Sequence, residues 1–253
     1  MSTNIDLDKF YTPVETAKKC INLFYETFPN TTEIIEPSAG AGVFSLQIDE
    51  CIAYDIEPEH ESIIQQDFLE LDIPYKKGRA FIGNPPFGNR NNLSRSFYKQ
   101  ACKMGDMIGF ILPISQMNNS DSLYLFDLVK SVDLGVLEYS GMKVHCCFNL
   151  YSRPINGVLN SKPRLQSSMF TIYRDDQSGY DEIDFDLCIF RRGASIGKEK
   201  FENIHTQTYK IVVNDKNNIA FVRDSILNFD WQNYKKHQSA PSLSKNDIYR
   251  VFL

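Results

Sequence analysis

The chain has 253 residues, of which 42% are hydrophobic and 23% are charged, and its formal net charge is −5. These values are typical of a globular protein with a sizeable core, and they exclude a disordered chain. No apolar run approaches the roughly 20 residues of a membrane span, and the N-terminus lacks a basic segment followed by an apolar one. We therefore expect an intracellular, soluble protein that makes no membrane contact.

The charge is divided unevenly along the chain. Residues 1–150 hold 12 Lys and Arg against 20 Asp and Glu, whereas residues 151–253 hold 15 against 12. The basic second part favours contact with a polyanion there, with a solvated surface as the alternative. The six cysteines and four histidines have no metal-ligand spacing, so we expect buried thiols and neither a metal site nor a disulfide framework.

A helix is predicted over residues 14–27, because Pro13 can begin a helix and Ala17, Ile21 and Phe24 recur at helical spacing. Further along, apolar runs bounded by proline or glycine predict strands, and the segments between them predict helical or irregular connectors. The predicted strands cover residues 32–37, 51–58, 79–84 and 106–113, the connectors include residues 93–105 and 122–132, and a final pair of strands covers residues 134–140 and 144–153 with a tight turn around Gly141.

Near-continuous apolar strands that alternate with helices predict an α/β fold. The sheet is expected to be parallel and covered on both faces, with an antiparallel pair at its edge. In such sheets, ligands bind outside the carboxyl ends of the strands. Candidate site residues are therefore expected where each predicted strand ends.

Three strand ends carry groups suited to a ligand. The first passes into a turn with Gly40 and Gly42, where the backbone can approach a ligand closely. The second ends in Tyr54-Asp55-Ile56-Glu57, where the carboxylate of Asp55 can accept hydrogen bonds from the two hydroxyls of a ribose. The next acidic turn, with Asp67 and Phe68, offers an acceptor and a ring to an adenine. Together they predict one binding site.

The predicted strand over residues 79–84 ends in Asn84-Pro85-Pro86-Phe87. Two consecutive prolines fit neither a helix nor a central strand, so the strand stops here and the backbone that follows is stiff. The segment therefore holds an amide, with its acceptor and two donors, beside an aromatic ring.

These segments, in this order, resemble the class I S-adenosylmethionine-dependent methyltransferases, and among them the N(6)-adenine DNA methyltransferases, which modify the exocyclic amine of adenine. The resemblance rests on an aromatic-Thr-Pro segment, an E-P-x-x-G-x-G turn, an acidic strand end, an Asp-Phe pair and an N-P-P-[FYW] segment. In this chain they are Phe10 to Pro13, Glu36 to Gly42, Asp55, Asp67-Phe68 and Asn84 to Phe87.

The resemblance implies a Rossmann-like fold with a mostly parallel seven-stranded sheet and an antiparallel edge strand. It implies a catalytic domain over residues 1–155. Residues 156–253 match none of these segments, and their basic charge leads us to expect a small target-recognition or substrate-binding part. The implied cofactor is S-adenosyl-L-methionine. The residues implied to bind it are Tyr11, Thr12, Pro13, Glu36, Pro37, Ser38, Ala39, Gly40, Gly42, Asp55, Ile56, Asp67, Phe68 and Asn84.

The first turn also argues against a nicotinamide dinucleotide. A dinucleotide fold uses G-x-G-x-x-G, with the pyrophosphate on a helix N-terminus. This chain has only Gly40 and Gly42, and Glu36 stands just before them. A carboxylate there would repel a pyrophosphate, and it suits a cofactor that has an amino group and a sulfonium.

For the reaction, Asn84, Pro85, Pro86 and Phe87 are the predicted catalytic residues. The side-chain oxygen of Asn84 and the carbonyl of Pro85 would accept the two N–H groups of the target amine, so that its lone pair points at the methyl group. Phe87 would stack on the base, a contact worth about 1 to 3 kcal/mol. No cysteine follows a proline, which argues against carbon methylation of cytosine.

The expected partner is nucleic acid, with DNA ahead of RNA, and a base in a duplex must be flipped out to reach Asn84. Arg90 and Arg95 in the next loop, and Arg191 and Arg192 in the second part, are the predicted substrate contacts. Solvated arginines on an exposed loop and on an edge strand are the alternatives.

Other substrates stay open at this point. The same segment occurs in enzymes that methylate the amine of guanine in RNA or the amide of a protein glutamine, and RNA adenine is a further alternative. A methyltransferase-fold binding subunit that acts with a protein partner is the second alternative, because the C-terminal part is short for target recognition.

Overall fold

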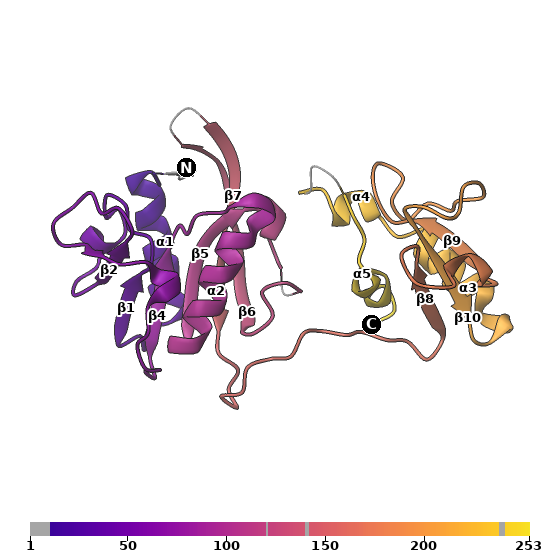
Figure 1. Ribbon diagram of the computed structural model, residues 1–253, viewed down its shortest axis with the longest axis horizontal. Helices are drawn as coiled ribbons and strands as arrows, with labels where there is room; N and C mark the ends of the chain where they lie inside the picture. The colour runs from indigo at the N-terminus through magenta and orange to yellow at the C-terminus, as the bar shows by residue number, and fades with distance from the viewer. Residues whose placement is uncertain (1–10, 120, 140–141, 238–240) are drawn as a thin grey trace, which may run out of the picture. The chain divides into compact units, whose positions relative to one another are not determined.

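The computed structural model describes residues 11–119, 121–139, 142–237 and 241–253. It divides into two compact units, Met1–Lys162 and Pro163–Leu253 (Figure 1). The division falls seven residues after the boundary expected from the sequence. The reason is that Asn160 still binds the first unit, where its N–H donates to the Leu125 carbonyl at 2.9 Å and its amide donates to Asp127 at 2.8 Å. Within the described ranges, no helix is both long and apolar enough to cross a membrane.

The first unit is built on one seven-stranded sheet with the order β3-β2-β1-β4-β5-β7-β6. Its elements are α1 (Val14–Thr27), β1 (Glu33–Glu36), β2 (Ile52–Asp55), β3 (Ile64–Gln65), β4 (Arg79–Gly83), α2 (Asn92–Met104), β5 (Met107–Pro113), β6 (Asp127–Tyr139) and β7 (Met142–Ser152). The strands from β3 to β5 pair in parallel, and β7 is antiparallel to both β5 and β6. This is the Rossmann-like arrangement of class I methyltransferases, which confirms the predicted fold class, and the antiparallel strand lies one position in from the edge.

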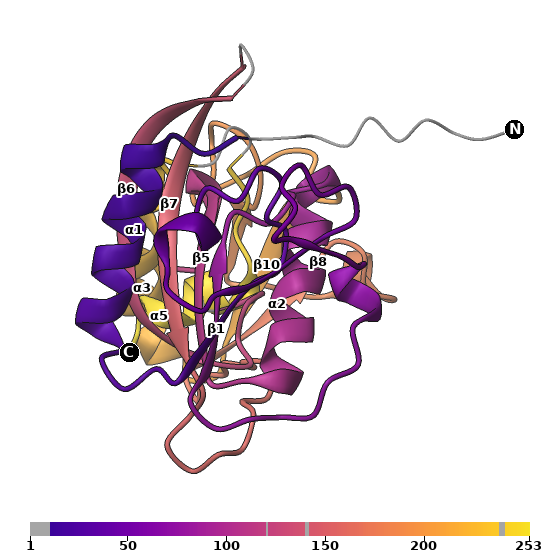
Figure 2. The same cartoon turned by 90° about the vertical axis from the view of Figure 1, so that its left-hand side faces the viewer.

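The two helices of this unit cover opposite faces of the sheet (Figure 2). α1 begins after Pro13 and buries a stripe of residues at helical spacing, from Ala17 to Phe24. Neighbouring residues of β1 alternate between the faces, so Ile34 packs in the α1 cluster and Ile35 packs in the α2 cluster. The sheet is therefore buried on both sides, as its apolar strands predict.

The predicted connector over residues 122–132 is wrong in its second half, because β6 begins at Asp127. Pairing with β7 runs from Asp127 opposite Ser152 to Tyr139 opposite Met142, and it is interrupted by two register shifts. Such irregularities break the period-two pattern by which a strand is recognised. The predicted pair of strands over residues 134–140 and 144–153 is confirmed, and its turn around Gly141 lies outside the described residues.

The second unit has a three-stranded antiparallel sheet in the order β8-β10-β9. Its elements are β8 (Phe170–Arg174), β9 (Leu187–Phe190), β10 (Thr208–Val213), α3 (Ile219–Leu227), α4 (Trp231–Tyr234) and α5 (Lys245–Arg250). Trp231 is a packing residue: it is 3% exposed, and its Nε1–H donates to the Ile226 carbonyl at 2.8 Å.

Candidate active site

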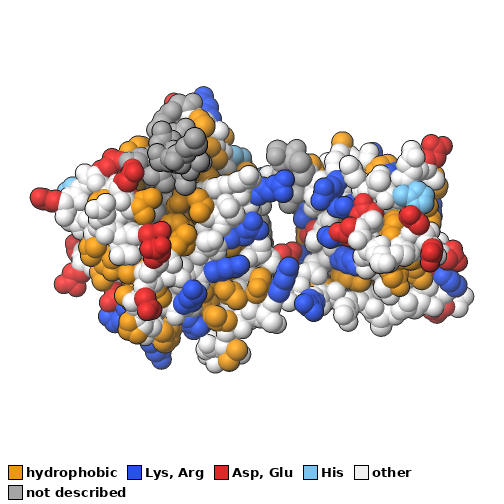
Figure 3. Space-filling model, viewed as in Figure 1, with side chains coloured by type: hydrophobic (Ala, Val, Ile, Leu, Met, Phe, Trp, Pro, Cys, Tyr) orange, Lys and Arg blue, Asp and Glu red, His pale blue; other side chains and the backbone are white. Residues whose placement is uncertain are grey.

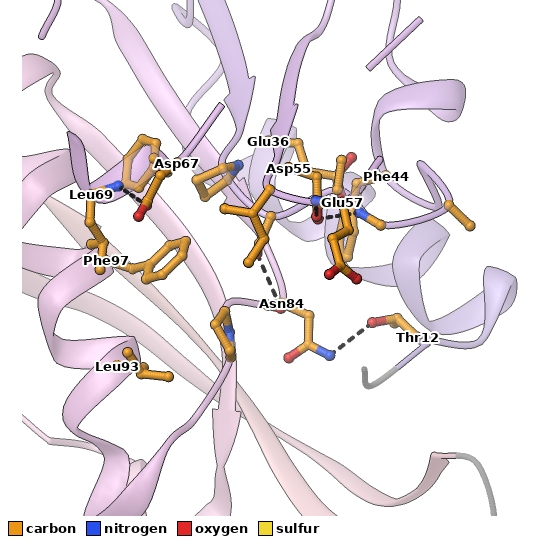
Figure 4. Close-up of a pocket in the computed structure, with 18 of the residues that line it drawn as sticks. Thr12, Glu36, Phe44, Asp55, Glu57, Asp67, Leu69, Asn84, Leu93 and Phe97 are labelled. Atoms are coloured by element: carbon orange, nitrogen blue, oxygen red, sulfur yellow. Dashed lines mark hydrogen bonds between the residues drawn. The ribbon is translucent and has the colours of Figure 1, made fainter. Parts of the chain in front are cut away.

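A pocket of about 740 Å³ opens at the carboxyl ends of β1, β2 and β4 (Figure 4). The strand order reverses between β1 and β4, and such a switch point is where doubly wound folds bind ligands. Most of the predicted site residues come together here. Those that line the pocket are Tyr11, Thr12, Glu36, Pro37, Ser38, Ala39, Gly40, Asp55, Ile56, Asp67, Phe68, Asn84 and Pro86. Pro13, Gly42, Pro85 and Phe87 are not among the lining residues, and Phe10 lies outside the described residues.

Glu36, the last residue of β1, brings a buried carboxyl group to the pocket. Its side chain is almost entirely buried, and its Oε2 accepts the N–H of Ser45 at 2.8 Å. Burial raises the pKa of the Glu36 carboxyl to about 8, and the nearby charge of Asp55 acts in the same direction. A cation bound in the pocket would favour the ionised form of this group.

Asp55, the last residue of β2, joins two turns of the pocket. The N–H of Gly40 donates to its Oδ2 at 2.7 Å, and the N–H of Glu57 donates to its Oδ1 at 2.8 Å. Gly40 adopts a φ of +53°, a left-handed conformation that favours glycine. Each carboxylate oxygen has a second lone-pair site, so Asp55 can still accept a hydrogen bond from a ligand.

Asp67 and Phe68 form the third part of the wall. Asp67 Oδ1 accepts the N–H of Leu69 at 2.8 Å and caps a short 3-10 helix. The Phe68 ring is 1% exposed and stacks on the ring of Phe97, with centroids 5.3 Å apart. Phe68 therefore lines the pocket from within the core, and its position is set by packing against α2.

Asn84 follows β4 and is held by two segments that are distant in sequence. Its Nδ2 donates to Thr12 Oγ1 at 3.1 Å, and its backbone carbonyl accepts the Ser38 hydroxyl at 3.4 Å. Figure 4 shows the amide oxygen of Asn84 on the side away from Thr12. Because Thr12 is 5% exposed, this hydrogen bond is shielded from water. The amide is thus held in one orientation at the pocket.

The ring of Phe87 lies elsewhere. It is 7% exposed and belongs to the apolar cluster on the α1 side of the sheet, together with residues such as Ile82. Pro85 is also buried, whereas Pro86 lines the pocket. Stacking of Phe87 on a substrate base stays a prediction, and it requires the base to reach this ring.

Two carboxylates that sequence reasoning did not select, Glu57 and Glu59, also line the pocket. The hydroxyl of Tyr11 donates to Glu59 Oε1 at 2.6 Å, which links the N-terminal segment to the turn after β2. The run of acids at alternate positions from Asp55 to Glu59 was the available signal. With Glu36 and Asp67, five carboxylates line the pocket, and the described lining residues include no Lys, Arg or His.

The far wall comes from the loop after β4 and the first turns of α2. Sequence reasoning did not select the residues of this wall either. The apolar residues at the start of α2 have the spacing of any helix face that packs on a core, so nothing in the sequence marks them as pocket residues. The lining residues of this wall are Gly88, Asn89, Asn92, Leu93 and Phe97. The turn after β1 adds Ala41, Val43 and Phe44, and the segment around Phe68 adds Gln66 and Leu69.

Arg90 and Arg95 border this wall. Arg95 Nε donates to the Asn91 carbonyl at 3.1 Å, and its Nη2 donates to the Arg90 carbonyl at 3.2 Å, so Arg95 holds the loop in place. Arg90 itself is exposed. Asn91 stands at the N-cap of α2 without a side-chain capping hydrogen bond.

Arg191 and Arg192 belong to the second unit, where they follow β9. Arg191 Nε pairs with Asp175 Oδ1 at 2.8 Å, and its side chain is only 11% exposed. Arg192 is exposed. A phosphate contact by Arg191 would therefore have to replace an existing ion pair.

The six cysteines are free thiols, and all except Cys51 are buried, as the sequence predicts. Burial raises the pKa of both Cys20 and Cys51 to about 12, so neither is a nucleophile near neutral pH. Among the residues that the structure describes, no group of three or more His, Cys, Asp or Glu is placed to hold a metal ion.

No family model matches the sequence, and the search of curated proteins also finds no match. Solved structures do match in fold. A proposed RNA methyltransferase from Pyrococcus horikoshii is 17% identical over 61% of this chain and 91% of its own, with a TM-score of 0.48. A proposed class I S-adenosylmethionine-dependent methyltransferase from Listeria monocytogenes is 11% identical over 65% and 66%, with a TM-score of 0.46. The modification subunit of a proposed type I restriction enzyme from Vibrio vulnificus is 11% identical over 67% and 47%, with a TM-score of 0.44. At these identities the likeness is one of fold alone.

Proposed function

We propose that this protein is an S-adenosylmethionine-dependent methyltransferase that transfers a methyl group to the exocyclic amine of adenine in DNA. The observation that carries the proposal is the amide of Asn84, which follows β4 and is held by a hydrogen bond to Thr12. Five acidic side chains line the other walls of the same pocket. The acidic walls suit a cationic methyl donor, and the amide suits the amine that accepts the methyl group.

The residues of the pocket fit this cofactor. S-adenosylmethionine supplies a methyl group on a positively charged sulfur and also carries an ammonium group. Glu36 is a buried carboxyl whose ionised form a cation would stabilise, and Asp55 stands at the strand end where a ribose would be bound. A dinucleotide or other phosphate-bearing cofactor is disfavoured, since the described residues that line the pocket include five acidic side chains and no Lys, Arg or His.

The role of Asn84 is to orient the acceptor amine. Because Nδ2 donates to Thr12, the amide oxygen is directed to the other side, where it would accept one N–H of the target amine. The carbonyl of Pro85 would accept the second N–H. Holding both N–H groups fixes the direction of the nitrogen lone pair. Alignment of reacting atoms in this way can supply a large part of the reduction in the activation free energy of methyl transfer.

The far wall suits a planar base. Pro86, Leu93 and Phe97 supply apolar surface, and Asn89 and Asn92 supply amides that can hydrogen-bond the edge of a base. Adenine in DNA is the target that the resemblance of the Asn84 to Phe87 segment favours, with RNA amines and protein glutamine as the competing substrates.

The test is transfer of labelled methyl from S-adenosylmethionine to separate pools of DNA, RNA and protein. We expect label in DNA, recovered as N6-methyladenine after digestion. Asn84→Ala is expected to lower the rate by at least about a hundredfold, the scale seen when a preorganised hydrogen-bonding group is removed. Asn156→Ala, which removes an exposed amide of the same unit, is the matched control and should keep the wild-type rate.

Two results would reject the proposal: label confined to RNA or protein, or undiminished transfer to DNA by Asn84→Ala. Binding of S-adenosylmethionine without transfer to any pool would instead identify a binding subunit.

A further inference from the structure

Charge is strongly segregated along the first unit. Residues 20–75 contain 12 Asp and Glu and no Lys or Arg, whereas residues 76–105 contain seven Lys and Arg and no Asp or Glu. The acidic segment forms β1 to β3 and supplies the five acidic side chains among the described residues that line the pocket. The basic segment forms β4, the loop after it and α2.

Within the basic segment, the charges near α2 are not neutralised. Arg79 and Lys76 both pair with Glu33 at the start of β1. By contrast, no described carboxylate lies within ion-pair distance of the four cations that we call the α2 stripe. The α2 stripe consists of Arg90, Arg95, Lys99 and Lys103. Its net charge is therefore available to a ligand.

Helix geometry aligns this charge. Arg95, Lys99 and Lys103 are each four residues apart, so they lie on one face of α2, and Lys99 and Lys103 are exposed. Three residues at this spacing extend over about 12 Å of helix axis. Blue side chains follow the face of the first unit over α2 in Figure 3.

The stripe begins at the pocket. Asn89 and Asn92 line the rim of the pocket and flank Arg90 in sequence, whereas Arg95, two residues from both Leu93 and Phe97, lies on another face of α2. The hydrogen bonds of Arg95 to the carbonyls of Asn91 and Arg90 keep its guanidinium at this rim. A polyanion that delivers one of its groups into the pocket would thus meet the α2 stripe on leaving it.

We infer that the α2 stripe binds the phosphates of the DNA strand whose adenine enters the pocket. This inference rests on the proposed function and adds the path of the backbone. The phosphates beside a flipped base are repelled by the acidic side chains of the cofactor half, so the strand runs over the basic half. The C-terminal Arg191, already paired with Asp175, is not needed for this contact.

The test is binding of the full chain to a labelled duplex DNA oligonucleotide, measured by fluorescence anisotropy over a series of salt concentrations. Lys99→Glu with Lys103→Glu changes two exposed residues of the stripe, so the fold should be kept. Lys18→Glu with Lys19→Glu is the matched control, because it reverses two exposed lysines of α1 on the opposite face of the sheet.

Each phosphate contact contributes about 0.9 to the slope of log K against log salt. We therefore expect the α2 double variant to lose about 2 from this slope and to bind at least about tenfold more weakly at low salt. The α1 double variant should keep the wild-type slope. Both variants should bind S-adenosylmethionine with the wild-type Kd, which verifies that they are folded.

An unchanged slope in the α2 double variant would overturn the inference, as would a stripe-dependent slope for RNA or poly-glutamate with no binding of DNA. The outcomes separate the two proposals. DNA binding that depends on α2 without methyl transfer rejects the function and retains the phosphate path. Methyl transfer to DNA with an unchanged slope retains the function and rejects the path.

Discussion

Asn84 Nδ2 donates to Thr12 Oγ1 at 3.1 Å, across 72 positions of sequence. The hydrogen bond joins the segment before α1 to the end of β4, and Thr12 is almost fully buried. Valine would fill the space of Thr12 equally well, but only serine or threonine offers a hydroxyl there to accept the hydrogen bond. The orientation of the Asn84 amide is therefore set by a residue of the N-terminal segment.

Thr12→Val should lower kcat for methyl transfer by about two- to tenfold, the range that one net hydrogen bond supplies. Valine has nearly the same shape but cannot hold Nδ2, so the amide can rotate out of its catalytic orientation. Steady-state kinetics of Thr12→Val and Thr12→Ser test this. Thr12→Ser keeps the hydroxyl and should retain most of kcat, and a Thr12→Val variant with the wild-type kcat would mean that the hydrogen bond does not matter.

The buried carboxyl of Glu36 should make the stability of the cofactor-free protein depend on pH. Its pKa is raised from 4.5 to about 8, so the folded state binds a proton more tightly than the unfolded state does. This contribution is fully present below about pH 4.5 and is lost as pH rises through about 8. The free energy of unfolding, from urea titrations, should therefore fall over this interval, by an amount on the order of a few kcal/mol.

Glu36→Gln removes the titration and retains an oxygen that can accept the Ser45 N–H. We expect this variant to lose the decline in stability between pH 5 and pH 8 and to bind S-adenosylmethionine more weakly than the wild type at pH 8. A variant with the same pH dependence as the wild type would show that another group causes the decline.

Gly88 allows the tight entry into the loop before α2. It has a φ of +66°, and a Cβ added there would lie 2.4 Å from Asn92 Oδ1 and 2.7 Å from Leu93 Cγ. Gly88→Ala should thus displace two residues of the pocket wall and lower the melting temperature. Gly157→Ala is the control for backbone strain alone, because Gly157 has a φ of +75° and its Cβ would meet no atom within 4 Å.

We expect Gly88→Ala to cost more than Gly157→Ala in melting temperature, measured by differential scanning calorimetry, and to reduce methyl transfer, which Gly157→Ala leaves unchanged. Gly88, with a ψ of 178°, also lies in a backbone region that is essentially open only to glycine, so equal losses in the two variants would assign no role either to this conformation or to the clash with α2.

Much of the architecture follows from local sequence. The helix over residues 14–27 is predictable because Pro13 can start it and its apolar residues recur with a 3.6-residue period. The observed α1 has these bounds. The ends of β1, β2 and β4, near Glu36, Asp55 and Asn84, are predictable because prolines, glycines and acidic residues interrupt the apolar runs. The extent of β6 is harder to predict, since its two register shifts disturb the alternation of apolar and polar residues that marks a strand.

The sequence by itself determined the order of strands and turns, and hence which groups face the carboxyl edge of the sheet, because strand ends are marked by local backbone preferences. Only the tertiary structure decided that Thr12 holds Asn84, that Glu57 and Glu59 join the wall, and that Phe87 packs under α1. It likewise decided that Arg191 pairs with a carboxylate, whereas no carboxylate of the described residues pairs with the α2 stripe. Contacts between residues distant along the chain depend on how whole elements pack, and burial and pairing are properties of that packing.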